Sequence, residues 1–158
     1  MAADIFAKIG DIKGESLDSK HKDEVEILSW SWGVMQTGTL AHGGGGAGKA
    51  RFQDFVFTHH IDKASPLLMK SCATGTHIKD ATITVRKAGK GQQEFYTVKL
   101  TDILISSVQQ SGSDGVLPTE SVSLNFAKIE FDYKPQKADG TLGAAVTFKY
   151  DLKANKQL

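Results

Sequence analysis

Hydrophobic and polar residues alternate with a period of two along most of this chain, and no other feature limits its fold as strongly. A period of two places alternate side chains on opposite faces of a β-strand. The first long run covers Val25–Met35, and Leu28, Trp30 and Trp32 share one phase of it. Ser31 lies on the other phase. We therefore predict a strand over Val25–Met35 whose tryptophans pack in the core and whose Ser31 points away from it.

The same alternation predicts further strands and a bend. They cover residues 5–9, 52–61, 81–86, 95–100 with a continuation to 108, 122–133 and 146–152. Gly89-Lys90-Gly91 predicts a hairpin turn between two of them. The hydrophobic phase changes between Phe126 and Ala127, which predicts a bulge or bend that lets this strand curve.

A single segment, Ser65–Gly75, has the signals of a helix. Ser65 suits the N-cap, Pro66 the first helical position and Gly75 the position after the last turn. Many strands with one short helix predict a β-barrel or a β-sandwich. The chain shows no internal repeat or linker, so we expect one domain over residues 1–158.

Composition and charge exclude several classes of protein. With 40% hydrophobic and 23% charged residues the chain is an ordinary globular sequence, and its net charge of +1 does not suggest a nucleic-acid partner. No apolar run has the roughly 18 residues that a membrane helix needs, so no membrane insertion is expected. Residues 1–6 lack the features of a Sec signal peptide. Cys72 is alone, which excludes an internal disulfide and favours folding in a reducing compartment.

A glycine-rich segment at residues 42–50 imitates two nucleotide-binding motifs. Gly43, Gly45 and Gly48 satisfy G-x-G-x-x-G, and Gly43 with Gly48-Lys49 nearly satisfies the P-loop. Both motifs require a helix to follow, because its N-terminus holds the phosphates. Here a strand is predicted to follow, and Ala50 replaces the Ser or Thr that would bind magnesium. We expect no nucleotide and no other cofactor at this segment.

The same segment also imitates the oxyanion loop of lipases. His42-Gly43-Gly44-Gly45 resembles that loop, but the chain has no G-x-S-x-G motif to supply the nucleophile. Residues 37–50 are better explained as a long excursion between two strands. Such loops are uncommon in compact domains unless they serve binding or assembly.

The histidines do not form a metal or catalytic pattern. His59 and His60 are adjacent in a predicted strand, so their side chains leave opposite faces and cannot hold one ion. Cys72 and His77 flank a helix end without CxxC or HExxH spacing. No Ser/His/Asp or Cys/His arrangement can be identified from spacing. We therefore predict no metal site and no enzymatic activity.

The order of several short motifs resembles one known family. The pieces are Lys8-Ile9-Gly10-Asp11, Gly14-Glu15-Ser16, Trp30-Ser31-Trp32-Gly33, the glycine segment, Phe57-Thr58, residues 61–66, Ser106-Ser107-Val108, residues 120–127 and Asp139-Gly140. In this order and spacing they are similar to the haemolysin-coregulated protein (Hcp) family of bacterial type VI secretion systems, over almost the whole chain.

The resemblance implies a fold, an assembly and partners. It implies a small antiparallel β-barrel with one flanking helix, whose copies form hexameric rings that stack into a tube. The tube would carry effector proteins and contact the spike and sheath proteins, after assembly in the cytoplasm and before secretion. The glycine loop is the expected ring-stacking element, through Gly43, Gly44, Gly45, Gly46, Gly48 and Lys49. Ser31 is the candidate for the lumen-facing wall.

Two other functions stay open from the residues alone. The first is a monomeric β-barrel that binds a ligand, possible because Trp30-Ser31-Trp32 could form an aromatic platform. Strand phase favours a core role for the two indoles over that platform. The second is an enzyme that uses the glycine loop and the histidines, against which the missing motif context argues.

Overall fold

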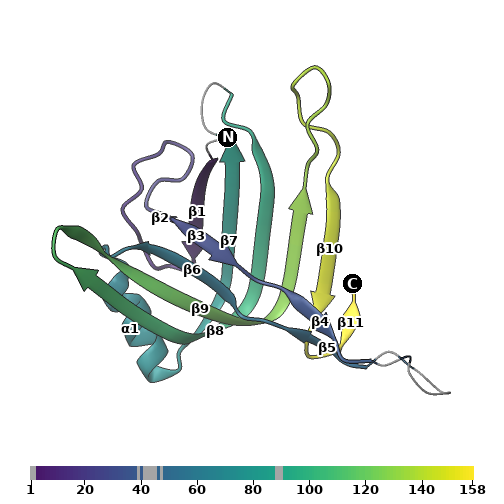
Figure 1. The fold of residues 1–158 in the computed structure, drawn as a ribbon, viewed down its shortest axis with the longest axis horizontal. Coiled ribbons are helices and arrows are strands. Elements are labelled where there is room, and N and C mark those ends of the chain that lie inside the picture. The colour runs from purple at the N-terminus through teal and green to yellow at the C-terminus, as the bar shows by residue number, and fades with distance from the viewer. Residues whose placement is uncertain (1–2, 39, 41–45, 47, 88–90) are drawn as a thin grey trace.

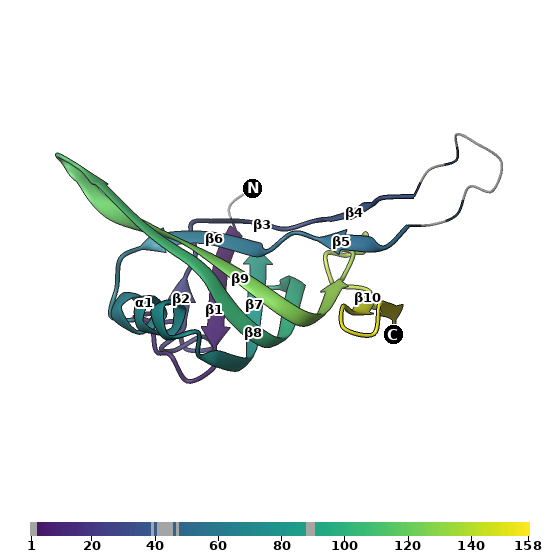
Figure 2. The ribbon, with the colours of Figure 1, turned by 90° about the horizontal axis from the view of Figure 1, so that it is seen from below.

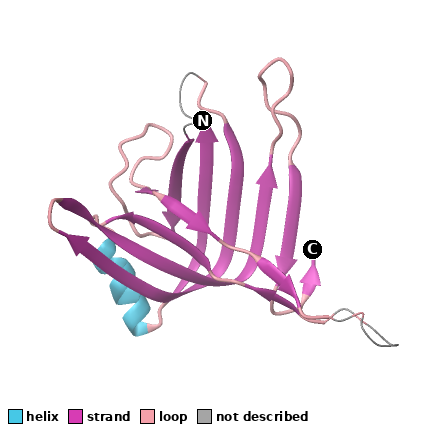
Figure 3. Ribbon diagram, in the orientation of Figure 1, coloured by secondary structure: helices cyan, strands magenta, loops and turns pink. Residues whose placement is uncertain are grey.

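The structure, a computed structural model, describes residues 3–38, 40, 46, 48–87 and 91–158. Within these ranges one helix and eleven strands form a curled, antiparallel β-structure (Figures 1 and 3). The elements are β1 (Ala3–Ile9), β2 (Val25–Glu26), β3 (Ser29–Ser31), β4 (Val34–Gln36), β5 (Ala50–Phe52), β6 (Phe55–His60), α1 (Ser65–Thr74), β7 (His77–Lys87), β8 (Glu94–Ser113), β9 (Val116–Tyr133), β10 (Val146–Asp151) and β11 (Lys156–Gln157). The predicted class, mainly β with one short helix, is confirmed.

Two long strands, β8 and β9, organise the sheet. They pair with each other, while the other edge of β9 is shared by β6 in its first half and β10 in its second half. From β8 the sheet continues through β7 and β1 to β2. The chain then passes from β2 into β3, which pairs with β6, so the sheet curls back on itself (Figure 1). The turn predicted at Gly89-Lys90-Gly91 falls mostly outside the described residues.

The predicted bend in β9 is confirmed. Phe126 and Ile129 are both buried, although an odd spacing would place them on opposite faces of a flat strand. The pairing of β8 with β9 is interrupted here, between Thr101↔Lys128 and Ile103↔Phe126. The residue of β8 at the interruption, Asp102, has a φ of +56°. The pairing register is the same on both sides of this gap, but the buried pair is Leu100 with Ile129 on one side and Ile103 with Phe126 on the other. The two halves of the ladder therefore bury opposite faces, and the sheet can curl.

The strand predicted over Val25–Met35 is wrong as a single element. It consists of β2, β3 and β4, and its phase changes, because Ile27 is buried and Leu28 is 51% exposed. The cause is a change of partner. The Ile27 amide donates to Ile5 in β1, whereas the Leu28 amide donates to Thr58 in β6. Leu28 therefore does not share the buried face of the tryptophans.

Trp30 and Trp32 pack against the core as predicted, although both are half-buried. Trp30 stacks on Phe55 and Tyr96, with ring centroids 5.9 and 5.1 Å away. The Trp32 indole N–H donates to the Tyr96 hydroxyl at 3.0 Å. The two indoles thereby fasten the β3 segment to the body of the sheet.

The helix α1 lies where the sequence predicts it, but its N-terminal signal acts differently. Ser65 is the first helical residue rather than the cap, and its hydroxyl accepts the backbone N–H of Asp62 at 3.1 Å. The Asp62 carboxylate accepts the Ala64 N–H at 2.9 Å, so the two residues support the entry turn reciprocally. Gly75 ends the helix with a φ of +65°, as predicted.

Candidate assembly surfaces

One face of the sheet formed by β3, β6, β9 and β8 carries mostly short polar side chains. Directly paired residues of neighbouring strands share a face, so the row Ser31–Val56–Ser123–Ser107 lies on one side. We call this surface the hydroxyl face. Its paired positions are Ser29, Ser31, Val56, Thr58, His60, Ser107, Gln109, Ser111, Thr119, Ser121 and Ser123. None of these positions holds Asp, Glu, Lys or Arg.

Hydrogen bonds between side chains tie the hydroxyl face together. Ser107 donates to Ser123 at 3.0 Å, and the hydroxyls of Ser29 and Thr58 lie 2.5 Å apart. At the margin beside β6, the Asp54 carboxylate accepts bonds from Ser106 at 2.6 Å and Asn125 at 3.1 Å. The surface thus offers many small donors and acceptors, and the acidic group at its margin is already hydrogen-bonded.

The sequence identified only Ser31 of this face. Ser31 is exposed in β3, opposite Trp30 and Trp32, as its phase predicts. The remaining members had a detectable signal, because polar residues recur with period two at Thr119, Ser121, Ser123 and Asn125. Such a run is typical of an ordinary solvated strand face. Only the pairing of four strands shows that these positions form one continuous surface.

The glycine loop grows out of a two-stranded ribbon, β4 paired with β5, which projects from the body of the molecule (Figure 2). Of the predicted stacking residues, Gly43, Gly44 and Gly45 lie outside the described residues. Gly46, Gly48 and Lys49 are exposed. The strand β5 follows the glycines, so the helix that either nucleotide motif requires is absent at this position.

Gly48 occupies a position that a larger residue could not share without a shift of the chain. A Cβ at residue 48 would lie 2.5 Å from the Thr37 hydroxyl and 2.7 Å from the Gly38 amide nitrogen. The Thr37 hydroxyl donates to the Lys49 carbonyl at 3.2 Å, across the same ribbon. Gly48 therefore allows the two sides of the loop base to approach closely.

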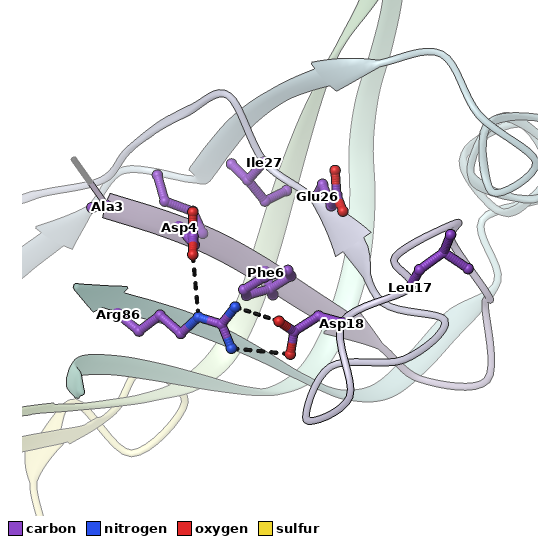
Figure 4. Close-up of a pocket in the computed structure, with 9 residues that line it drawn as sticks. Ala3, Asp4, Phe6, Leu17, Asp18, Glu26, Ile27 and Arg86 are labelled. Carbon is purple, nitrogen blue, oxygen red and sulfur yellow. Dashed lines mark hydrogen bonds and ion pairs between the residues drawn. The ribbon is translucent and has the colours of Figure 1, made fainter. Parts of the chain in front are cut away.

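A hollow of about 390 Å³ lies beside β1, where Arg86 is 3% exposed (Figure 4). Its guanidinium forms two bonds with the Asp18 carboxylate and a third with Asp4 at 3.3 Å, and it lies 4.8 Å from the centre of the Phe6 ring. The bonds from Arg86 lower the pKa of Asp18 to about 2. Three guanidinium nitrogens already donate to carboxylates, so this cluster fastens the segment between β1 and β2 rather than presenting a free cation.

A second cluster of ionisable side chains is buried on the side of β6 and β9 opposite the hydroxyl face. His59 and Glu120 are 0% and 1% exposed, and the His59 Nε2 atom lies 2.8 Å from a Glu120 oxygen. The other Glu120 oxygen accepts from Gln110 at 2.8 Å. Adjacent His60 is exposed on the hydroxyl face, so the predicted separation of the two histidines is confirmed. Burial lowers the pKa of His59, but the Asp62 carboxylate 3.8 Å from its Nδ1 atom and the bonded Glu120 carboxylate outweigh that effect, and the pKa lies above its usual value.

The raised pKa of His59 predicts a pH-dependent stability. A raised pKa means that the fold favours the protonated ring, so its stabilisation is complete below the usual value of 6.5 and is lost as the pH rises through the folded pKa. We expect the free energy of unfolding to fall as the pH rises above about 6.5, and His59→Gln to reduce that slope. Urea unfolding at several pH values measures it. His60→Gln is the control and should keep the wild-type slope.

Neither a metal centre nor a membrane-crossing helix is seen in the described ranges. Among those residues no three His, Cys, Asp or Glu side chains are grouped to hold an ion. The helix found there is also too short and too polar to cross a bilayer.

A small, curled antiparallel sheet with a projecting ribbon and one flanking helix defines a mainly β protein. Comparison with known families identifies one family that this chain matches. Residues 6–133 match the family described as "Type VI secretion system effector, Hcp". The chain is 48% identical over 161 residues to Protein hcp1 of Pseudomonas aeruginosa, covering 99% of both chains.

Solved structures give the same result. Hcp1 from Salmonella typhimurium superposes with a TM-score of 0.82 at 39% identity, covering 100% of both chains. A structure described as a type six secretion system protein reaches a TM-score of 0.93 at 28% identity, covering 99% of this chain and 100% of the other. A type VI effector from Yersinia pestis gives 0.78 at 38% identity, covering 94% and 99%. The chain belongs to the Hcp family of type VI secretion, whose members are secreted structural proteins, and the resemblance predicted from sequence is confirmed.

Proposed function

We propose that this chain is the tube subunit of a type VI secretion system. Hexameric rings of the chain stack into a tube whose lumen carries effector proteins. Its partners are further copies of itself together with the spike, sheath and effector proteins of the apparatus. It assembles in the cytoplasm and then leaves the cell, and its role is structural, without catalysis or a cofactor.

The observation that carries this proposal is the hydroxyl face. A strand surface in water usually holds Lys, Glu and other charged residues, because these are the residues most often exposed. Four adjacent strands here share a face without Asp, Glu, Lys or Arg at the paired positions. A wall without fixed charges neither traps nor repels charged chains strongly. Such a wall suits a channel for varied proteins, and Ser31 lies on it.

The mass of the purified protein tests the proposal. Light scattering at micromolar concentration with a chelator present should report about six times the subunit mass of 17.1 kDa. Negative-stain images of the same sample should show rings. A monomer under these conditions would refute the tube subunit and favour the monomeric ligand-binding barrel.

Ser31→Gln is expected to impair the binding and passage of effector proteins without impairing the fold. Ser31 is exposed and opposite the core, and surface substitutions usually change stability by less than about 0.5 kcal/mol. The longer side chain would narrow the lumen and replace a hydroxyl with an amide. Melting temperature and ring mass should match wild type, while co-purification of effectors falls. Ser29→Gln, on the same strand and face, is a second lumen variant, and an unfolded Ser31→Gln would contradict the assignment of this face.

Shortening the segment Gly43–Gly48 is expected to weaken stacking of rings while leaving each ring intact. Glycines add no side chain to a core, and ordering them costs roughly 1–2 kcal/mol of backbone entropy per residue, so a second surface must compensate. The proposed surface is the adjacent ring. Electron microscopy should show shorter tubes, and light scattering an unchanged ring mass. Loss of the ring would instead assign the segment to the contact between neighbours within a ring.

A further inference from the structure

His59 lies between two carboxylates that belong to different parts of the fold. Its Nε2 atom is 2.8 Å from a Glu120 oxygen on β9, and its Nδ1 atom is 3.8 Å from an Asp62 oxygen in the connection between β6 and α1. The His59 side chain is 1% exposed, and that of Asp62 is 14% exposed. A buried imidazole with a carboxylate beside each nitrogen is well placed to respond to a change in its own charge.

The charged groups that face this ring are those two carboxylates. On β6, the centre of the Phe57 ring lies 5.6 Å from that of His59. On β8, Gln110 donates to the second oxygen of Glu120, and the buried residues of α1 are uncharged. The charge preference of His59 is therefore determined by Asp62 and Glu120 together with burial.

The two nitrogens of His59 need two protons to serve both carboxylates. An ionised carboxylate accepts hydrogen bonds and cannot donate them. A ring with one proton that donates to Glu120 therefore turns the lone pair of Nδ1 toward Asp62. In the described part of the chain this Nδ1 atom has no hydrogen-bond partner. The protonated ring attracts Asp62, and the neutral ring does not.

Asp62 is also central to the turn that begins α1. Its carboxylate accepts the Ala64 N–H at 2.9 Å, and its carbonyl accepts the Ser65 N–H at 3.1 Å. The next amide, that of Lys63, donates to the Glu15 carboxylate at 2.8 Å. A movement of Asp62 would therefore disturb both the start of α1 and its tie to the segment between β1 and β2.

A hollow of about 290 Å³ gives the Asp62 carboxylate room to move away from His59. Asp62 lines it together with Glu15, Glu26, His60 and apolar residues. Glu15, Glu26 and His60 are exposed, so water reaches the hollow. Water can solvate the carboxylate there, but the charges of Glu15 and Glu26 oppose its entry. The inward position is therefore favoured as long as His59 is protonated.

We propose that His59 is a proton-operated latch on the start of α1. When protonated it holds Asp62 inward and the entry turn closed, and when neutral it releases Asp62 toward the hollow while keeping its bond to Glu120. The raised pKa of His59 supports the direction, because it means that the closed structure favours the protonated ring. The latch is a local device, so it goes beyond the pH dependence of global stability, and it does not depend on the formation of rings.

Hydrogen exchange of the full chain at several pH values, from about 6 upward, tests the latch. Protection of the amides in residues 61–68, corrected for base catalysis of exchange, should fall about tenfold as the pH rises. Low concentrations of urea should leave this exchange unchanged, because a local opening exposes little surface.

Two variants separate the parts of the latch. His59→Gln removes the titrating ring, and Asp62→Asn removes the charge of the carboxylate while keeping an oxygen for the Ala64 amide. In both variants the protection of residues 61–68 should no longer depend on pH. His60→Gln, at the neighbouring position on the opposite face of β6, is the matched control and should behave as wild type.

Each other result overturns the latch. Wild-type exchange without pH dependence would exclude it, and so would a dependence that persists in His59→Gln or disappears in His60→Gln. A dependence lost in His59→Gln but kept in Asp62→Asn would assign the response to the bond with Glu120. Exchange that accelerates in low urea would show global unfolding in place of a local opening. The proposed tube subunit stands or falls separately, by the mass of the purified protein.

Discussion

Glu120→Ala is expected to lower the free energy of unfolding by about 3–5 kcal/mol, because it removes one partner of a buried, hydrogen-bonded pair. Glu120 is 1% exposed and accepts bonds from both His59 and Gln110. Its loss leaves the His59 ring inside the protein without its carboxylate. Since domains of this kind unfold at a cost of about 5–15 kcal/mol, such a loss is a large share of the total.

Urea unfolding followed by tryptophan fluorescence measures this change, at one fixed protein concentration because assembly adds to apparent stability. Glu130→Ala is the matched control on the same strand. Glu130 meets Lys149 at 3.6 Å near the surface, and such pairs contribute about 0–1 kcal/mol. A double variant, His59→Leu with Glu120→Leu, should recover part of the loss, since apolar residues often replace a buried ion pair. Equal effects of Glu120→Ala and Glu130→Ala would show that the pair is not buried.

Period-two alternation was sufficient to predict most of the strands, because a half-buried strand must place its apolar residues on one face. It located the bend of β9 for the same reason, since a change of phase at Phe126 is a change of buried side. It failed at Val25–Met35, where the strand changes partner from β1 to β6. A local pattern does not record which neighbour a strand pairs with.

The projecting end of the β8–β9 ladder, residues 109–118, was also missed, although its turn has a clear local signal. Asp114-Gly115 joins β8 to β9, and Gly115 has a φ of +78°. Asp-Gly between strands is a strong hairpin signal, but here the flanking residues do not alternate between apolar and polar. Serines and glutamines precede the turn, because this end of the ladder covers no core. The alternation signal is therefore weakest where the β8–β9 ladder projects beyond the core.

Trp32→Ala is expected to cost about 3 kcal/mol, the lower end of the range for large aromatic residues, because Trp32 is half-buried. The indole packs edge-on against Phe131 at 5.6 Å and donates its N–H to the Tyr96 hydroxyl. It thus fastens the chain between β3 and β4 to β8 and β9, and its loss should also loosen the β4–β5 ribbon.

Trp32→Phe separates the two contributions of this side chain. It keeps a ring against Phe131 but loses the donated hydrogen bond, which contributes about 1 kcal/mol, and part of the packed indole surface. Thermal and urea unfolding should therefore rank wild type above Trp32→Phe and Trp32→Phe above Trp32→Ala. If Trp32→Ala instead unfolds like wild type, the indole is not part of the packing that holds β3 in place. A ligand platform at Trp30-Ser31-Trp32 would then be the better explanation, because a half-buried aromatic that contributes nothing to stability needs another role.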